Sequence, residues 1–202
     1  MMSELLAYAE LGFRHITDLQ GADHILFLLV LAAVYRLRDW RAAIWVVTAF
    51  TAGHSLTLAL AVTGVMRLPT PLIEFLIPVT IVATAVENMV ARRSGRLGNR
   101  RVVFAGLFGL VHGAGFANYL RSLFMERIAV PLLGFNLGIE AGQLVVLVAA
   151  FGCFAVVDRA LALAPSVRDG ARYSSPLGLR AIGVSLVVAV VAARWAAERY
   201  PW

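Results

Sequence analysis

Long apolar runs separated by short polar connections dominate the chain. An α-helix needs about 20 such residues to cross the hydrocarbon core of a bilayer. The pattern predicts six membrane-spanning helices, at approximately 20–36, 42–65, 71–90, 102–120, 131–157 and 178–197. A shorter stretch, Ser3 to Gly12, mixes Leu and Ala with two glutamates. We expect it to form a short N-terminal helix at the membrane interface, because it is too short and too charged to span.

The composition agrees with a membrane protein. Hydrophobic residues make up 60% of the chain and charged residues 15%, whereas soluble domains have about 45–50% and about 25%. We therefore predict an all-α, polytopic membrane helix bundle, with residues 1–202 forming a single integral membrane domain. The one cysteine, Cys153, excludes an intrachain disulfide.

The net charge of +6 comes entirely from arginine, because the eighteen basic residues include no lysine. In a soluble protein such a charge would suggest nucleic acid as a partner. Here the arginines lie in short loops, so we expect a lipid bilayer and no nucleic acid. Twelve arginines follow the first, third and fifth spans and six lie on the other side. Because arginine-rich loops stay cytoplasmic, we predict a bacterial inner-membrane protein with both termini periplasmic. The sequence does not indicate an oligomeric state.

Ionisable groups inside a bilayer are costly unless they find a partner or water, so each one marks a candidate site. The first group lies just ahead of the first span and comprises His15, Asp18, Asp23 and His24. Gly21 offers a break, and a turn there would bring the two histidines and Asp23 together. The alternative is that Asp23 only caps the helix and that His15 lies among headgroups.

Two further histidines fall in the middle of spans. His54, in the second span, lies beside a polar stripe formed by Thr48, Thr51 and Ser55. We expect it to be a metal ligand or proton relay, the alternative being a structural histidine bonded to a threonine. His112 lies in the fourth span next to Gly113, whose spacing from Gly109 allows a neighbouring helix to approach closely.

Polar side chains also occur in the fifth and third spans. In the fifth, helical spacing predicts one face with Asn136, Glu140 and Gln143, opposite a face with Gly134, Gly138 and Gly142. A structural network between helices is the alternative to a functional role. In the third, Glu87 and Asn88 share a face with Thr80 and Thr84, but an interfacial ion pair between Glu87 and Arg92 would explain the carboxylate equally well.

The mid-membrane groups fall at overlapping depths and supply nitrogen and oxygen donors. We predict metal ligation by Asp23, His24, His54, His112 and Glu140. We predict supporting or entrance roles for His15, Asp18, Thr51, Ser55, Glu87, Asn88, Asn136 and Gln143. Imidazole and carboxylate donors without a thiolate set suit a divalent transition metal such as Ni, Co or Zn, and the sequence leaves its identity open.

Several motifs resemble the HupE/UreJ family of hydrogenase and urease accessory membrane proteins, especially its second, less characterised branch. The matching motifs are Gly12-Phe-Arg-His15-Ile, Asp23-His24-Ile-Leu-Phe, Thr48-Ala-Phe-Thr51-Ala-Gly53-His54-Ser55, Glu74-Phe-Leu-Ile-Pro78, Glu87-Asn88, Phe108-Gly-Leu-Val-His112-Gly-Ala-Gly-Phe and Phe135-Asn136-Leu-Gly-Ile-Glu140-Ala-Gly-Gln143. The resemblance implies a bundle of six or seven helices that transports nickel or cobalt.

The chain departs from the nickel-permease branch at two of these motifs. That branch has His-x5-Asp-His, whereas seven residues separate His15 from Asp23 here. Its second motif has a histidine and a glutamate at the places of Phe108 and Gly115. The chain therefore carries fewer metal donors than that branch.

Three functions compete at this stage. The first is a metal-cation permease of the nickel or cobalt type, or a metal-binding accessory protein. The second is an intramembrane zinc hydrolase with three histidines on the metal and Glu140 as base. The third is a non-catalytic assembly subunit whose polar groups only join helices. The same residues serve the first two functions, so the sequence does not decide whether the protein is an enzyme. Because no phosphate-binding loop is found, any transport is expected to be secondary or passive.

Overall fold

The protein is a bundle of α-helices. The structure is a computed structural model and describes residues 2–66, 69–94, 100–123, 128–163 and 175–202, among which no strand occurs. Its elements are α1 (Met2–Thr17), α2 (Asp23–Ala32), the short 3₁₀ helix η1 (Leu37–Asp39), α3 (Trp40–Val62), α4 (Thr70–Ser94), α5 (Arg100–Leu123), α6 (Ala129–Ala162) and α7 (Pro176–Glu198). The predicted all-α class is confirmed.

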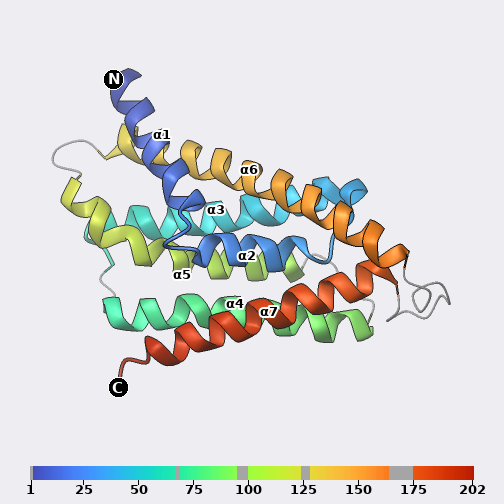
Figure 1. Cartoon of the computed structure of the whole chain (residues 1–202). Coiled ribbons are helices and arrows are strands. Elements are labelled where there is room, and N and C mark those ends of the chain that lie inside the picture. The colour runs from blue at the N-terminus through green and yellow to red at the C-terminus, as the bar shows by residue number, and fades with distance from the viewer. Residues whose placement is uncertain (1, 67–68, 95–99, 124–127, 164–174) are drawn as a thin grey trace.

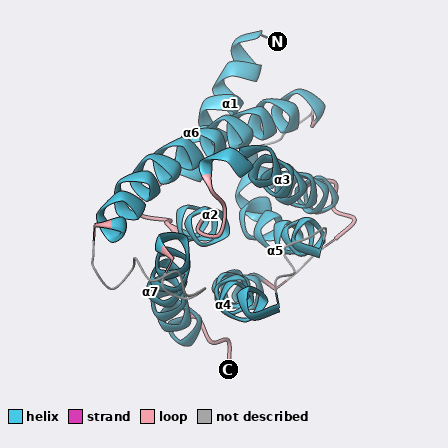
Figure 2. Ribbon diagram, turned by 90° about the vertical axis from the view of Figure 1, so that its right-hand side faces the viewer, coloured by secondary structure: helices cyan, strands magenta, loops and turns pink. Residues whose placement is uncertain are grey.

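The helix α2 lies in the middle of the bundle, surrounded by α3, α4, α5, α6 and α7 (Figure 2). Its sequence, DHILFLLVLA, is apolar on every side after the first two residues. A helix that is apolar all round suits the interior of a bundle. Phe27, Leu28 and Val30 are at most 1% exposed. Both termini of the chain lie at the same end of the bundle (Figure 1).

Four helical segments among the described residues are long and apolar enough to cross a membrane. They are Leu37–Val62, Thr70–Val90, Ala129–Ala162 and Pro176–Glu198, which match the second, third, fifth and sixth predicted spans. The predicted span 102–120 lies within α5, which is not among these four. The outward faces carry large apolar side chains, and Val148 is 73% exposed. Such a surface is unfavourable in water but ordinary in lipid, as expected of an integral membrane protein.

The first predicted span, 20–36, differs most from the structure. The helix there, α2, has only 10 residues, and α1 before it has 16. The two are joined by a turn and run in different directions (Figure 1). In the turn between them, the backbone N–H of Gln20 donates a 2.9 Å hydrogen bond to the Asp18 carboxylate. A break at membrane depth is tolerated where the backbone is buried in protein or lines a wet cavity.

The N-terminal helix is confirmed as helical, but it continues to Thr17 and packs along α6. A Cβ built on Gly12 would overlap the carbonyl of Phe135, and one on Gly138 would overlap the carbonyl of Ala9. The glycine face predicted for the fifth span is therefore the face on which α1 lies. The backbones come this close only because these positions carry no side chain.

The helices α3 and α5 form a second closely packed pair. A Cβ on Gly53 would overlap the carbonyl of Gly106, and one on Gly109 would overlap that of Phe50. A Cβ on Gly113 would meet the backbone of His54. This confirms the close approach predicted from Gly109 and Gly113, and it identifies α3 as the neighbouring helix.

The C-terminal end of α2 is held by a buried arginine. Arg180 of α7 is 4% exposed, and its guanidinium donates to the carbonyls of Ala33 (3.2 and 3.3 Å) and Tyr35 (2.6 Å). It also pairs with Asp158 of α6. These bonds satisfy carbonyl groups of buried residues that follow the last turn of a short helix.

Candidate metal centre

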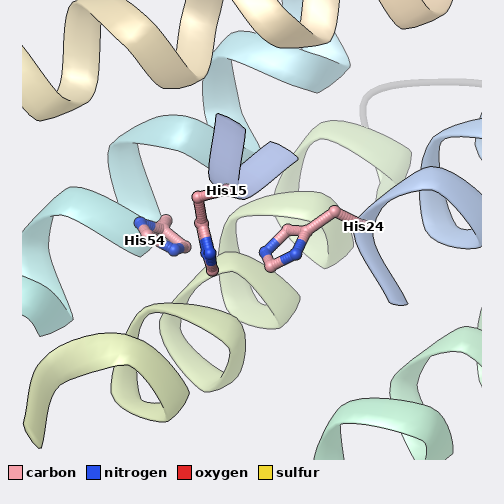
Figure 3. Close-up of side chains that lie close together, drawn as sticks. All are labelled: His15, His24 and His54. Carbon is pink, nitrogen blue, oxygen red and sulfur yellow. The ribbon is translucent and has the colours of Figure 1, made fainter. Parts of the chain in front are cut away.

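Four helices bring the four histidines together in the middle of the bundle. His15 comes from the last turn of α1, His24 from the first turn of α2, His54 from the middle of α3 and His112 from the middle of α5. Figure 3 shows His15 between His54 and His24, with the rings turned toward one another. The turn predicted around Gly21 therefore brings His15 and His24 together, and α3 adds His54.

The spacing of three imidazoles suits a single small cation. Each of His15, His24 and His54 offers one ring nitrogen, and these three atoms lie within 4.8 Å of one another. Two nitrogens bound to one transition-metal ion at about 2.0–2.1 Å are at most about 4 Å apart. A small side-chain adjustment therefore closes the set around an ion. His112 lies beside it, with its ring centroid 5.1 Å from that of His24.

Each of the four histidines has at least one buried ring nitrogen that lacks a hydrogen-bond partner among the described residues. His54 is 0% exposed, and neither of its nitrogens is bonded. The same holds for Nε2 of His15, Nε2 of His24 and Nδ1 of His112. Leaving a buried polar atom unsatisfied costs about 1–3 kcal/mol. The concentration of such atoms at one point is explained if they are ligands for a cation, and the donor set fits Ni, Co or Zn.

His112 is oriented by a threonine that sequence reasoning did not include in the site. Its Nε2 lies 3.0 Å from Oγ1 of Thr80 on α4. The Thr80 hydroxyl donates to the carbonyl of Ile77 at 2.7 Å, so it accepts from Nε2–H. Nδ1 of His112 is then the nitrogen with the free lone pair, in the manner of the partners that orient metal-binding histidines.

Phenylalanines enclose the cluster. The ring of Phe116 is 4.0 Å from that of His15 and stacks on Phe135 at 5.2 Å. Phe50 lies 5.1 Å and Phe27 5.3 Å from His112. The imidazoles therefore lie in apolar surroundings, where their attraction for a cation is weakly screened.

Two clefts reach the cluster from the end of the bundle that carries the termini. One, of about 340 Å³, is lined by His15, His24 and His112 and by the carboxylates of Asp18, Asp23 and Glu74. The other, of about 640 Å³, is lined by residues of α1 and the following turn, and it shares His15 and Asp18 with the first. Toward the opposite end, Phe27 and Phe108 border a space of only about 10 Å³. In this conformation the cluster is open to one end.

Two predicted carboxylate ligands lie outside the imidazole group. Asp23 lines the cleft next to His24, but its carboxylate pairs with Arg199 at 3.2 Å. Glu140 is half-buried on α6 and lies outside both the group and the clefts. Conversely His15, predicted as a supporting residue, belongs to the group. Asp18, predicted at the entrance, lines both clefts.

The polar stripe of α3 is joined to α6. The hydroxyl of Thr51 lies 2.7 Å from Oε1 of Gln143, which is fully buried. Ser55 bonds back to the carbonyl of Thr51 at 2.7 Å. Nε2 of Gln143 and Oδ1 of Asn136 are buried and have no partner among the described residues. No bond joins His54 to a threonine in this part of the chain, contrary to the structural alternative for that histidine.

Glu87 and Asn88 belong to a separate hydrogen-bond network, next to the small space that Phe27 and Phe108 border. Asn88 donates to the carbonyl of Val30 (2.6 Å) and to Ser185 (3.0 Å), and it accepts from Arg101 at 2.8 Å. Glu87 lies 3.7 Å from the same arginine. The network joins α2, α4, α5 and α7. A structural role for Glu87 and Asn88 is therefore favoured over a functional one. The side chain of Arg92, the partner expected from sequence, lies outside the described residues.

Sequence reasoning missed Thr80 as part of the site, and it missed Arg199 and the phenylalanine enclosure. Thr80 carried a signal, since it shares a helical face with Thr84, but nothing linked that face to His112. Arg199 carried none, because it stands 176 residues from Asp23.

The fold and the site define a polytopic membrane protein with a buried histidine cluster at its centre. Residues 1–199 match the HupE / UreJ protein family. The chain belongs to this family, as its motifs had suggested. Comparison with curated proteins and with solved structures finds no match.

Proposed function

We propose that the protein binds a divalent transition-metal cation, of the nickel or cobalt type, at the histidine cluster and carries it across the membrane. The observation that carries this proposal is the convergence of four imidazoles, each with a buried nitrogen that lacks a partner among the described residues, beside a cleft that three of them line. Membership of the HupE / UreJ family supports the same ion class.

The donor set favours movement of the ion over permanent retention. Imidazole is a good ligand for Ni, Co and Zn, and three or four neutral nitrogens bring no compensating negative charge. The carboxylates lie at the mouth of the cleft and not in the group. Transport needs binding that is strong enough to admit the ion and weak enough to release it.

The cleft and the arginine pattern together give a direction. The ends of α2, α4 and α6 that precede the arginine-rich connections all lie opposite the termini (Figure 1). If these connections are cytoplasmic, the open cleft faces the periplasm and the ion enters from outside. The phenylalanines beneath the cluster then form the closed inner side of the path.

The hydrolase alternative has less support. A metal-bound water needs a base within hydrogen-bond reach, and Glu140, the base expected from sequence, is outside the group of metal-binding atoms. An assembly subunit whose polar groups only join helices would not explain why the two buried nitrogens of His54 have no hydrogen-bond partner among the described residues.

Metal analysis combined with uptake tests the proposal. The purified protein is loaded with Ni²⁺, Co²⁺ or Zn²⁺, its metal content is measured, and uptake is followed in proteoliposomes. We expect stoichiometric binding and saturable uptake for wild type, and loss of both in His54→Leu. Because His54 is buried without a partner, an apolar residue there should leave the fold intact. Thr57→Val, a buried change on the same helix, is the control and should behave as wild type.

Each contrary outcome has a definite meaning. Absence of binding under all conditions, or wild-type uptake by the His54 variant, would refute the proposal. Stoichiometric zinc without any uptake would favour the hydrolase.

A further inference from the structure

An ion pair lies at the mouth of the cleft above the histidines. Nη1 of Arg199 is 3.2 Å and 3.3 Å from the two carboxylate oxygens of Asp23. The side chains are 32% and 15% exposed, respectively. The pair joins the C-terminal end of α7 to the first residue of α2, directly beside His24.

Arg199 is held through its backbone, and its guanidinium is partly exposed. Its amide donates to the carbonyl of Trp195 at 3.0 Å, and its guanidinium lies 5.5 Å from the centre of the Trp195 ring. The next residue, Tyr200, packs on Phe75 of α4 with ring centroids 5.7 Å apart. The segment is thus anchored on both sides, which keeps the arginine at the cleft with about a third of its side chain exposed.

The same cleft holds both the ion pair and the unsatisfied imidazoles. His24 and His112 line it with buried, unbonded nitrogens. Among the described lining residues, Arg199 is the only arginine, facing the carboxylates of Asp18, Asp23 and Glu74. A cation that enters by this cleft therefore meets one arginine among the described lining residues, and that arginine pairs with Asp23, the residue next to His24.

We propose that Arg199 is a displaceable counter-ion of Asp23 that sets the affinity of the metal site. The inference rests on the proposed function. With no ion in the cleft, the guanidinium neutralises a largely buried carboxylate, which would be costly to leave unpaired. An entering divalent cation repels the guanidinium and takes over Asp23. When the ion leaves, Arg199 returns to the carboxylate. Metal and arginine thus compete for one partner, and the ion pair weakens binding.

Binding of Co²⁺ to the purified full-length protein in detergent, measured by equilibrium dialysis, tests this competition. We expect Arg199→Gln to bind Co²⁺ at least about fivefold more tightly, the lower end of typical coupling between two sites. Arg199→Lys keeps the charge and should bind as wild type does. Arg194→Gln is the matched control, because Arg194 lies on the same helix, is exposed, and pairs with Glu198 instead. It should leave the affinity unchanged.

A double-mutant cycle shows whether Arg199 acts through Asp23. In an Asp23→Asn background the effect of Arg199→Gln should vanish, because the contested carboxylate is gone. Persistence of the full effect in that background, an unchanged or weaker affinity of Arg199→Gln, or tighter binding by Arg199→Lys would each overturn the inference while leaving the proposed function standing. A wild-type protein that binds no Co²⁺ would overturn the proposed function, and the inference with it.

Discussion

The four histidines are not equivalent at the level of single residues. Among the described residues, only His112 has a ring nitrogen held by a neighbouring side chain, through the hydrogen bonds from Nε2 to Thr80 and from Thr80 to the carbonyl of Ile77. This chain of bonds fixes which nitrogen of His112 faces the cluster. The ring nitrogens of His54 have no such bond among the described residues, so an ion bound there would orient that ring itself.

The threonine bond gives a prediction about affinity. Thr80→Val keeps the shape of the side chain but removes the acceptor for Nε2–H, so His112 is free to rotate or to change tautomer. We expect Co²⁺ to bind about 10–100-fold more weakly, as found when partners of metal-binding histidines are lost. Equilibrium dialysis measures this.

Thr84→Val is the matched control for this change. Thr84 is also buried, lies one turn further along α4, and donates to the carbonyl of Thr80. It should bind Co²⁺ as wild type does. Equal losses in the two variants would show that α4 packing, and not the bond to His112, is what matters.

The sequence predicted which residue types matter but not all of their neighbours. His54 and His112 could be placed near mid-membrane because the apolar runs around them set their depth. Depth and a polar helix face predict Glu140 as a metal ligand, whereas the glycines that contact α1 fix the rotation of α6. The pairing of Asp23 with Arg199 follows no pattern in the chain, since only the folded bundle brings the two together.

At the level of elements, the close helix contacts position the imidazoles. His54 directly follows Gly53, His112 directly precedes Gly113, and His15 lies one turn after Gly12. Each of these glycines lies at a contact between backbones. The positions of the histidines are therefore set by backbone packing, which is stiffer than packing through long side chains.

Two glycines on α6 should respond in opposite ways to the same substitution. In Gly138→Ala the new methyl group would overlap the Ala9 carbonyl, so α1 must shift; we expect a loss of about 1–3 kcal/mol in stability and weaker Co²⁺ binding. In Gly152→Ala nothing lies within 4 Å, and the better helix propensity of alanine should give a gain of up to about 1 kcal/mol. Thermal unfolding in detergent compares them. A destabilised Gly152 variant, or an unaffected Gly138 variant, would contradict this view of the α1–α6 contact.

The sequence predicted the glycine faces but left their partners open. The helical spacing of the glycines identifies a face without side chains, but it does not show which helix packs on that face. The charges of Glu4 and Glu10 suggested a helix at the interface. In the structure Glu10 pairs with Arg14 on the exposed side, while Gly12 and Ile16 on the other side are buried against α6. A charged face and a buried face coexist on one short helix, and that is how α1 joins the bundle.

For the whole molecule, an ion held by four helices should stabilise the entire bundle. A ligand that binds only the folded state adds about 2.7 kcal/mol at a free concentration 100 times its Kd. We therefore expect Co²⁺ to raise the melting temperature of wild type and EDTA to reverse the shift. In His54→Leu the shift should be absent. A similar rise in both proteins would place the stabilising ion somewhere other than the histidine cluster.

The contact between α1 and α6 also has a consequence for the order in which the protein is assembled. A chain is made from its N-terminus, so α1 enters the membrane long before Gly134, Gly138 and Gly142 have been synthesised. Until then the helix that carries His15 lacks the glycine face on which it packs. The cluster is therefore completed during biogenesis by α6, a helix that contributes none of the four imidazoles, and a nascent chain that ends before α6 lacks a finished site.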